Sequence, residues 1–96
     1  RNGANYAAAK AGVEALIKSA ALEAAPAGVR ANCIAPGPFD TPMLTPERKA
    51  FIETRIPMGR VGRPDDLLGL VRFLLNAESG YLTGQVLHVN GGLLMP

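Results

Sequence analysis

The sequence predicts an α/β fold in which two short parallel strands are covered by helices. An alanine-rich segment over residues 6–25 has the composition of an α-helix. Two short apolar segments, residues 29–35 and 85–89, are bounded by glycine or proline and are typical of buried strands. A long excursion with two helical patterns separates them, which indicates a parallel crossover because antiparallel neighbours need only a short turn.

Two parallel strands do not form a stable domain by themselves. The first helix also has no strand before it against which it would pack. We therefore expect residues 1–96 to form a partial domain, the carboxyl-terminal half of a doubly wound parallel sheet.

The first helix should end at Pro26 and Gly28, since proline cannot continue a helix and glycine readily adopts the conformation that follows one. Its polar side is narrow and centres on the pair Glu14 and Lys18. A helix with apolar residues on most of its faces is normally buried on more than one side. The pattern predicts that this helix lies between its own sheet and another surface, such as a second subunit.

The strand over residues 29–35 should be covered on both faces of the sheet. Cys33 is therefore interpreted as a small core residue, and Asn32 should require a hydrogen-bond partner. The loop that follows, residues 36–43, lies at the carboxyl end of the strand, where open α/β sheets bind ligands. Its prolines stiffen it, and Gly37 would let the backbone approach a ligand closely. The alternative is an ordinary connecting loop.

Two helix starts lie between the strands. Residues 45–47, Thr-Pro-Glu, predict a cap and first turn of a short helix that ends before Pro57. Residues 63–66, Arg-Pro-Asp-Asp, predict a second helix that ends near Asn76. The apolar side chains over residues 43–58 fit either a lid over a ligand or a segment packed on the domain.

Composition excludes several classes of function. The net charge is +2 and the basic residues are dispersed, so no nucleic-acid partner is expected. No apolar run is long enough to span a bilayer, so no membrane association is expected. The single cysteine, Cys33, cannot form an internal disulfide, which favours a reducing, cytoplasmic compartment. His88 is the only histidine and is interpreted as structural, so no metal site is expected.

Tyr6 and Lys10 are the strongest candidates for catalysis. They are four residues apart and therefore share one face of the predicted helix. The reference pKa of a phenol is about 10, which makes tyrosine a poor proton carrier at neutral pH. A fixed ammonium group nearby favours the phenolate and lowers that pKa toward a useful range. Alone, the pair is also a common surface arrangement.

Motifs further along the chain occur in register with this pair. They are Asn32-Cys33-Ile34-Ala35-Pro36-Gly37 with Thr41, then Gly59-Arg60-x-Gly62-Arg63-Pro64-Asp65-Asp66, then Tyr81-Leu82-Thr83-Gly84-Gln85, and finally Asn90-Gly91-Gly92. Their order and spacing resemble the short-chain dehydrogenase/reductase family, from its catalytic tyrosine to its carboxyl end. The resemblance covers essentially the whole chain. It is nearest in character to the 3-oxoacyl-carrier-protein reductases and the sugar or polyol dehydrogenases.

The resemblance implies a Rossmann-like fold and an oxidoreductase that transfers a hydride between NAD or NADP and a small-molecule carbonyl or alcohol substrate. Tyr6 would be the acid/base at the substrate oxygen. Lys10 would lower the pKa of Tyr6 and bind the nicotinamide ribose. Tyr6 would also contact the cofactor.

The same resemblance assigns the loop after the first strand to the cofactor. Pro36, Gly37, the backbone at Phe39 and the hydroxyl of Thr41 would hold the nicotinamide and its carboxamide. Residues from about 43 to 58 would form a substrate lid. The first helix, and separately the last strand with the helix before it, would build the interfaces of a homotetramer.

Several features of the family are absent from these residues. The glycine-rich turn for the pyrophosphate, the serine that polarises the carbonyl and the residue that separates NAD from NADP do not occur here. Phe39 also stands where a branched aliphatic residue is usual, and Asn90 where aspartate is common. We therefore expect this chain alone to be inactive. The alternative is a non-catalytic module of the same fold that senses dinucleotides or serves in assembly.

Overall fold

The computed structural model describes residues 2–96, and it describes their side chains except at positions 2–4 and 6. In chain order the elements are α1 (Asn2–Ala24), the 3-10 turn η1 (Ala25–Ala27), β1 (Cys33–Pro36), α2 (Pro46–Glu53), α3 (Asp65–Leu75), the 3-10 turn η2 (Ala77–Ser79) and β2 (Val86–Val89). Each helix and strand predicted from the sequence is present.

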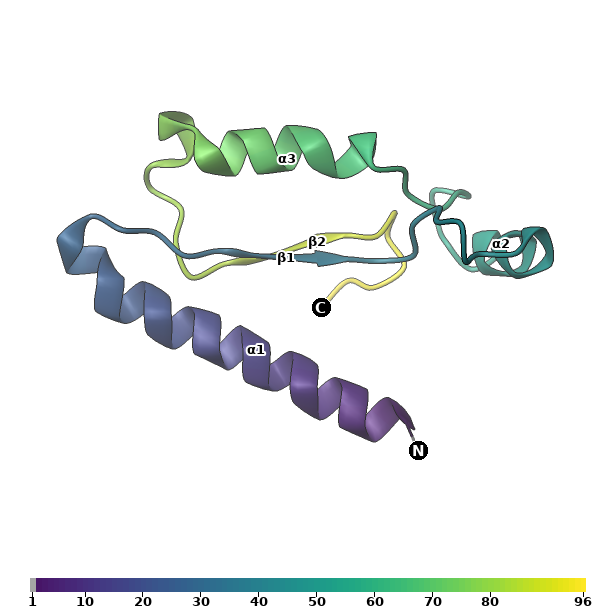
Figure 1. The fold of residues 1–96 in the computed structure, drawn as a ribbon, viewed down its shortest axis with the longest axis horizontal. Coiled ribbons are helices and arrows are strands. Elements are labelled where there is room, and N and C mark those ends of the chain that lie inside the picture. The colour runs from purple at the N-terminus through teal and green to yellow at the C-terminus, as the bar shows by residue number, and fades with distance from the viewer. Residues whose placement is uncertain (1) are drawn as a thin grey trace.

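The two strands form a parallel pair, as predicted. Cys33 lies opposite Val86, and Pro36 lies opposite Val89 at the carboxyl end of both strands. Helices α1 and α3 lie on opposite sides of this pair, and α2 lies beyond the carboxyl ends of the strands (Figure 1). The structure is therefore an α/β arrangement in three layers, with the loops that follow both strands at one end.

The end of α1 agrees with the prediction, although the helix begins earlier, at Asn2. Pro26 falls within the 3-10 turn, where its missing N–H is tolerated. Gly28 then takes a left-handed φ of 77°, and its N–H donates to the carbonyl of Ala25 at 2.9 Å. This cap ends the helix and turns the chain toward the sheet.

The first strand is shorter than the predicted range of residues 29–35, because it begins at Cys33 and includes Pro36. Side chains bond the preceding segment to the loop before β2: Thr83 Oγ1 accepts from the N–H of Ala31 at 3.1 Å. Asn32 finds the partners that its burial requires, since its amide donates to the carbonyl of Leu82 and accepts from the N–H of Gln85. Regular pairing begins only after this connection.

Pro36, the last residue of β1, does not interrupt the hydrogen bonds between the strands. Gly37 donates its N–H to the carbonyl of Val89 at 2.9 Å, so the ladder continues past Pro36 without needing a donor from it.

Within this chain much of the apolar surface of α1 is exposed, so the second surface that the prediction places against this helix does not come from the described residues. Ala21 is buried, but Val13, Leu16 and Leu22 expose 52%, 67% and 79% of their surface. The described chain is too short to cover both faces of so apolar a helix. A large apolar surface is thus left on α1, which is the side expected to meet a second subunit.

Helices α2 and α3 begin as predicted. The Thr45 hydroxyl caps α2 by accepting from the N–H of Arg48 at 3.2 Å, and Pro46 occupies its first turn. Asp65 and Asp66 lie in the first turn of α3, where carboxylates complement the helix dipole. Among the described residues, no helix combines the length and apolar character needed to cross a membrane.

Candidate functional site

A cleft between α1 and β1 brings together two residues that the sequence assigned to one site. Lys10, on α1, and Pro36, at the end of β1, both line this cleft, which has a volume of about 270 Å³. The remaining lining residues come from the same two elements and are mostly small or apolar: Ala9, Val13, Glu14, Cys33, Ile34 and Ala35. The cleft therefore has mostly apolar walls, with the ammonium group of Lys10 and the carboxylate of Glu14 among its lining groups.

Tyr6 lies one helical turn before Lys10 on α1. The side chain of Tyr6 lies outside the described residues, so its role stays a prediction. Lys10 is half-buried in the cleft. The described part of the predicted catalytic pair is thus placed at the carboxyl end of β1, where ligands of parallel sheets bind.

Gly37 does make a close approach, but to its own chain. A Cβ at this position would lie 2.5 Å from the Cβ of Asn90 and 2.9 Å from its Cα. The residue after β1 and the residue after β2 can therefore stay in contact only if one of them lacks a side chain. Asn90 therefore occupies the side of Gly37 where a side chain would stand, and the expected approach of this backbone to a ligand stays a prediction.

Phe39 faces away from the Lys10 cleft and packs on Gly62. The two residues form a parallel bridge, in which Asp40 donates to Gly62 O at 2.7 Å and Gly62 donates to Pro38 O at 2.9 Å. A Cβ on Gly62 would lie 2.5 Å from Cε2 of the Phe39 ring. The loop after β1 is thereby fixed to the segment before α3.

Thr41 is exposed and lines neither cavity described here. Its carbonyl accepts from the N–H of Leu44 at 3.0 Å, which closes a turn before α2. Among the described residues assigned to the cofactor, the structure brings Lys10 and Pro36 together. Phe39, which was assigned through its backbone, and Thr41 do not line that cleft.

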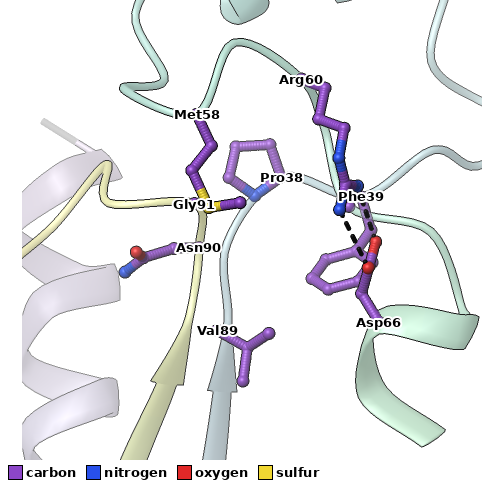
Figure 2. Close-up of a pocket in the computed structure, with 9 residues that line it drawn as sticks. Pro38, Phe39, Met58, Arg60, Asp66, Val89, Asn90 and Gly91 are labelled. Atoms are coloured by element: carbon purple, nitrogen blue, oxygen red, sulfur yellow. Dashed lines mark hydrogen bonds and ion pairs between the residues drawn. The ribbon is translucent and has the colours of Figure 1, made fainter.

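A second cavity, of about 180 Å³, lies at the carboxyl ends of both strands on the other side of this loop. Figure 2 shows residues from the two strand ends and from the segment before α3 converging on it. Its lining consists of Pro38, Phe39, Met58, Arg60, Gly62, Asp66, Val89, Asn90 and Gly91.

Arg60 and Asp66, which both line this cavity, form a bidentate ion pair. Nη1 and Nη2 of Arg60 donate to the two carboxylate oxygens of Asp66 at 2.8 and 3.0 Å. The Asp66 carboxylate also accepts from the N–H of Arg63 at 2.7 Å. These hydrogen bonds, first from Arg60 and then from Arg63, hold the pKa of Asp66 well below its usual range. The pair raises the pKa of Arg60 above its ordinary value.

The sequence predicts that residues 43–58 form either a lid or a packed element. In the structure one end of this segment is packed and the other end is exposed. Ile56 is buried, and Met58 donates its N–H to the carbonyl of Gly91 at 3.0 Å, which anchors this end to the residues after β2. Met43 and Phe51 are exposed, so the other end offers apolar side chains to solvent. Only this exposed part has the character of a lid.

Cys33 and His88 are each half-buried and not fully enclosed in the core. Cys33 is a free, half-buried thiol beside the Lys10 cleft. His88 is half-buried on β2, opposite Ala35 of β1. Among the residues that the structure describes, no group of three or more potential ligands is placed to hold a metal ion.

The comparisons with known proteins decide the family. Residues 1–94 match a family model described as enoyl-(acyl carrier protein) reductase. The chain belongs to the short-chain dehydrogenase/reductase family. It is 46% identical over 95 residues to the 3-oxoacyl-(acyl-carrier-protein) reductase FabG of Rickettsia bellii, covering 96% of this chain and 39% of that protein.

Solved structures of short-chain dehydrogenases agree in fold. The enzyme from Leptospira borgpetersenii with bound NAD+ has a TM-score of 0.86 and 40% identity, covering 94% of this chain and 35% of that one. A putative gluconate dehydrogenase from Agrobacterium tumefaciens has a TM-score of 0.86 and 39% identity. The match covers 97% of this chain and 39% of that one. The chain thus spans about two fifths of the length of the curated relatives it matches.

Two contacts beside the second cavity of this chain were not predicted from the sequence. Arg60 and Asp66 stand six positions apart and belong to one motif, but nothing in that spacing shows that they pair. The contact between Phe39 and Gly62 joins residues from different loops. A glycine opposite a large side chain would have indicated such a contact. That pairing can be recognised only when it is known which two loops lie together.

We expect Gly62→Ala to lower the free energy of unfolding by about 1–3 kcal/mol, because the new methyl group would overlap the Phe39 ring. Adding Phe39→Val should recover part of that loss by removing the ring. The measurement is urea unfolding, followed by circular dichroism, of a chimaera in which these residues follow the preceding part of the Leptospira short-chain dehydrogenase. Gly69→Ala in α3 is the matched control, since a Cβ there meets nothing within 4 Å and should not destabilise the chain. Equal costs for Gly62→Ala with and without Phe39→Val would contradict the contact.

Proposed function

We propose that this chain supplies the catalytic helix and the nicotinamide loop of an NAD- or NADP-dependent oxidoreductase. The reaction is hydride transfer between the cofactor and a small-molecule carbonyl or alcohol. The observation that supports the proposal is the cleft between α1 and β1, which Lys10 and Pro36 both line although they come from different elements. The named activities of the relatives support the same class of reaction.

The described residues fit a nicotinamide group in this cleft. Small and apolar residues form its walls, and the ammonium group of Lys10 offers hydrogen-bond donors to a ribose. Pro36 closes the end of the cleft. When bound, the nicotinamide supplies or accepts the hydride.

The rest of the loop would hold the cofactor through fewer groups than the sequence suggested. The N–H of Gly37 is already donated to Val89, so the main-chain group that Gly37 can offer a ligand is its carbonyl. The exposed hydroxyl of Thr41 and the backbone at Phe39 complete the proposed set.

Tyr6 and Lys10 would carry the proton. In the direction of reduction, the Tyr6 hydroxyl donates its proton to the substrate oxygen while the carbonyl carbon receives the hydride. In the reverse direction the phenolate accepts the proton of the alcohol. Lys10 stabilises the phenolate, which brings the pKa of Tyr6 closer to the working pH.

A chimaera tests this proposal. In it, residues 1–96 follow the preceding part of the Leptospira short-chain dehydrogenase, whose structure overlays this chain. We expect the chimaera to oxidise NADH or NADPH when a carbonyl compound, such as a 3-oxoacyl thioester, is present. A folded chimaera that binds cofactor but reduces no carbonyl compound would favour the non-catalytic alternative.

We further propose that the active protein is a homotetramer, or at least a dimer, in a reducing, cytoplasmic compartment. The exposed apolar residues of α1 support the first point, and the free thiol of Cys33 agrees with the second.

Leu16→Glu should dissociate the chimaera into smaller species, because a charge buried in an apolar interface is strongly unfavourable. Light scattering at micromolar concentration measures the change. Met43→Glu is the matched control, since it makes the same kind of substitution at an exposed residue far from α1 in the chain. A monomeric chimaera before any substitution would contradict the proposed assembly.

A further inference from the structure

The second cavity has a chemical character different from that of the Lys10 cleft. Its walls are largely the side chains of Pro38, Phe39, Met58 and Val89. In Figure 2 the Phe39 ring and the Val89 side chain lie along this space. Met58 is 68% exposed and stands at its rim. No proposed catalytic residue lines this cavity.

The polar side chains around the cavity are already paired within the chain. Both terminal nitrogens of Arg60 donate to Asp66. The amide of Asn90 donates to the carbonyl of Leu94 at 3.0 Å and accepts from the N–H of Gly92 at 3.0 Å. Figure 2 shows this amide turned away from Phe39 and Arg60.

Main-chain groups beside the Phe39 ring are engaged in the same way. The N–H of Gly62 donates to the carbonyl of Pro38, and the carbonyl of Gly62 accepts from the N–H of Asp40. A charged or strongly polar ligand could bind only by breaking these hydrogen bonds. This is costly because a donor or acceptor that loses its partner without gaining another raises the free energy. An apolar ligand displaces only water.

We propose that this cavity binds an uncharged apolar group about the size of a single aromatic ring or a short aliphatic chain. The volume of about 180 Å³ is suited to such a group, since an apolar cavity of about 150 Å³ binds benzene. Arg60 would not attract an anion here, because Asp66 neutralises it.

The natural occupant would be the non-reacting apolar end of the carbonyl or alcohol substrate, and this assignment rests on the proposed function. Pro36 lines the Lys10 cleft and Pro38 lines this cavity, so only Gly37 lies between them along the chain. A substrate that reacts beside Lys10 could therefore extend its apolar end past this loop.

Benzene tests the binding site without requiring cofactor or turnover. We expect titration of the chimaera with benzene to shift the methyl resonances of Met58 and Val89, with a Kd of about 1 mM or tighter. At ten times that Kd, benzene should raise the Tm by about 5 °C. Inorganic phosphate at the same concentrations should shift neither resonance. Shifts with phosphate, or none with benzene, would overturn the proposal.

Variants at Val89 locate the ligand. Val89→Phe should fill the cavity and weaken benzene binding by about tenfold or more, whereas Val29→Phe makes the same change at an exposed residue and should leave it unchanged. Val89→Thr, which keeps the shape and adds a hydroxyl, should also weaken binding and is the gentler variant if Val89→Phe unfolds. Unchanged binding in folded Val89→Thr and Val89→Phe would place benzene elsewhere and overturn the proposal.

The chimaera separates this inference from the proposed function. Benzene binding without hydride transfer would preserve the apolar site and reject the catalytic role. If both are present, Val89→Phe should raise the KM for a longer acyl substrate more than for acetone-sized ketones, with kcat for the small ketone unchanged. Hydride transfer without any benzene binding would reject the apolar site alone.

Discussion

Replacing Tyr6 with phenylalanine should reduce turnover by the chimaera at least about a hundredfold, which is the lower end of what a positioned acid or base contributes. Only the hydroxyl is lost, and the aromatic ring is kept. The affinity for NADH or NADPH should therefore change little. Steady-state kinetics and a fluorescence titration of the cofactor measure the two effects separately.

Tyr81→Phe is the matched control for this substitution. Tyr81 is fully exposed and lines neither cavity, so removing its hydroxyl should not change turnover. If Tyr6→Phe retains near-normal turnover, Tyr6 is not the acid/base. If it loses cofactor binding in proportion to turnover, its contribution is to binding and not to proton transfer.

The 96-residue chain alone should bind NADH and NADPH far more weakly than the chimaera and should transfer no hydride. The family places the pyrophosphate on a glycine-rich turn and the helix that follows it, and that motif does not occur in these residues. Each hydrogen bond to a charged group contributes about 1.5–3 kcal/mol, so losing several should weaken binding by orders of magnitude.

Parallel fluorescence titrations of the chain and the chimaera measure this difference. Within the described residues, β1 pairs on one edge only, with β2, so the chain alone should also tend to associate through its open edge. Concentration-dependent light scattering reports that association. Micromolar cofactor binding by the 96-residue chain would show that it holds a complete dinucleotide site.

Local sequence signals were sufficient to predict most of the fold. Proline and glycine marked the end of α1, and Thr45 with Pro46 marked the start of α2, because caps depend on residues close together in the chain. The strand β1 was predicted too long for the opposite reason. Its start depends on Thr83 and Gly84, which lie about fifty positions away.

The candidate site was predictable where a helix fixes the spacing and less so where two loops meet. Lys10 could be assigned because α1 fixes its distance from Tyr6, and the family resemblance added Pro36. The place of Phe39 could not be foreseen, because it depends on Gly62 of another loop. Likewise, the contact between Gly37 and Asn90 could not be foreseen, because it depends on the register of β1 with β2.

Direct hydride transfer is the most decisive measurement. The chimaera would be incubated with a carbonyl substrate and with NADH or NADPH carrying deuterium at C4, on either face of the ring in separate reactions. We predict that mass spectrometry will find deuterium at the former carbonyl carbon from one face only, and that Tyr6→Phe will reduce its rate of appearance at least about a hundredfold. A folded, cofactor-binding chimaera that incorporates no deuterium into any carbonyl compound would contradict the assignment of these 96 residues to an oxidoreductase.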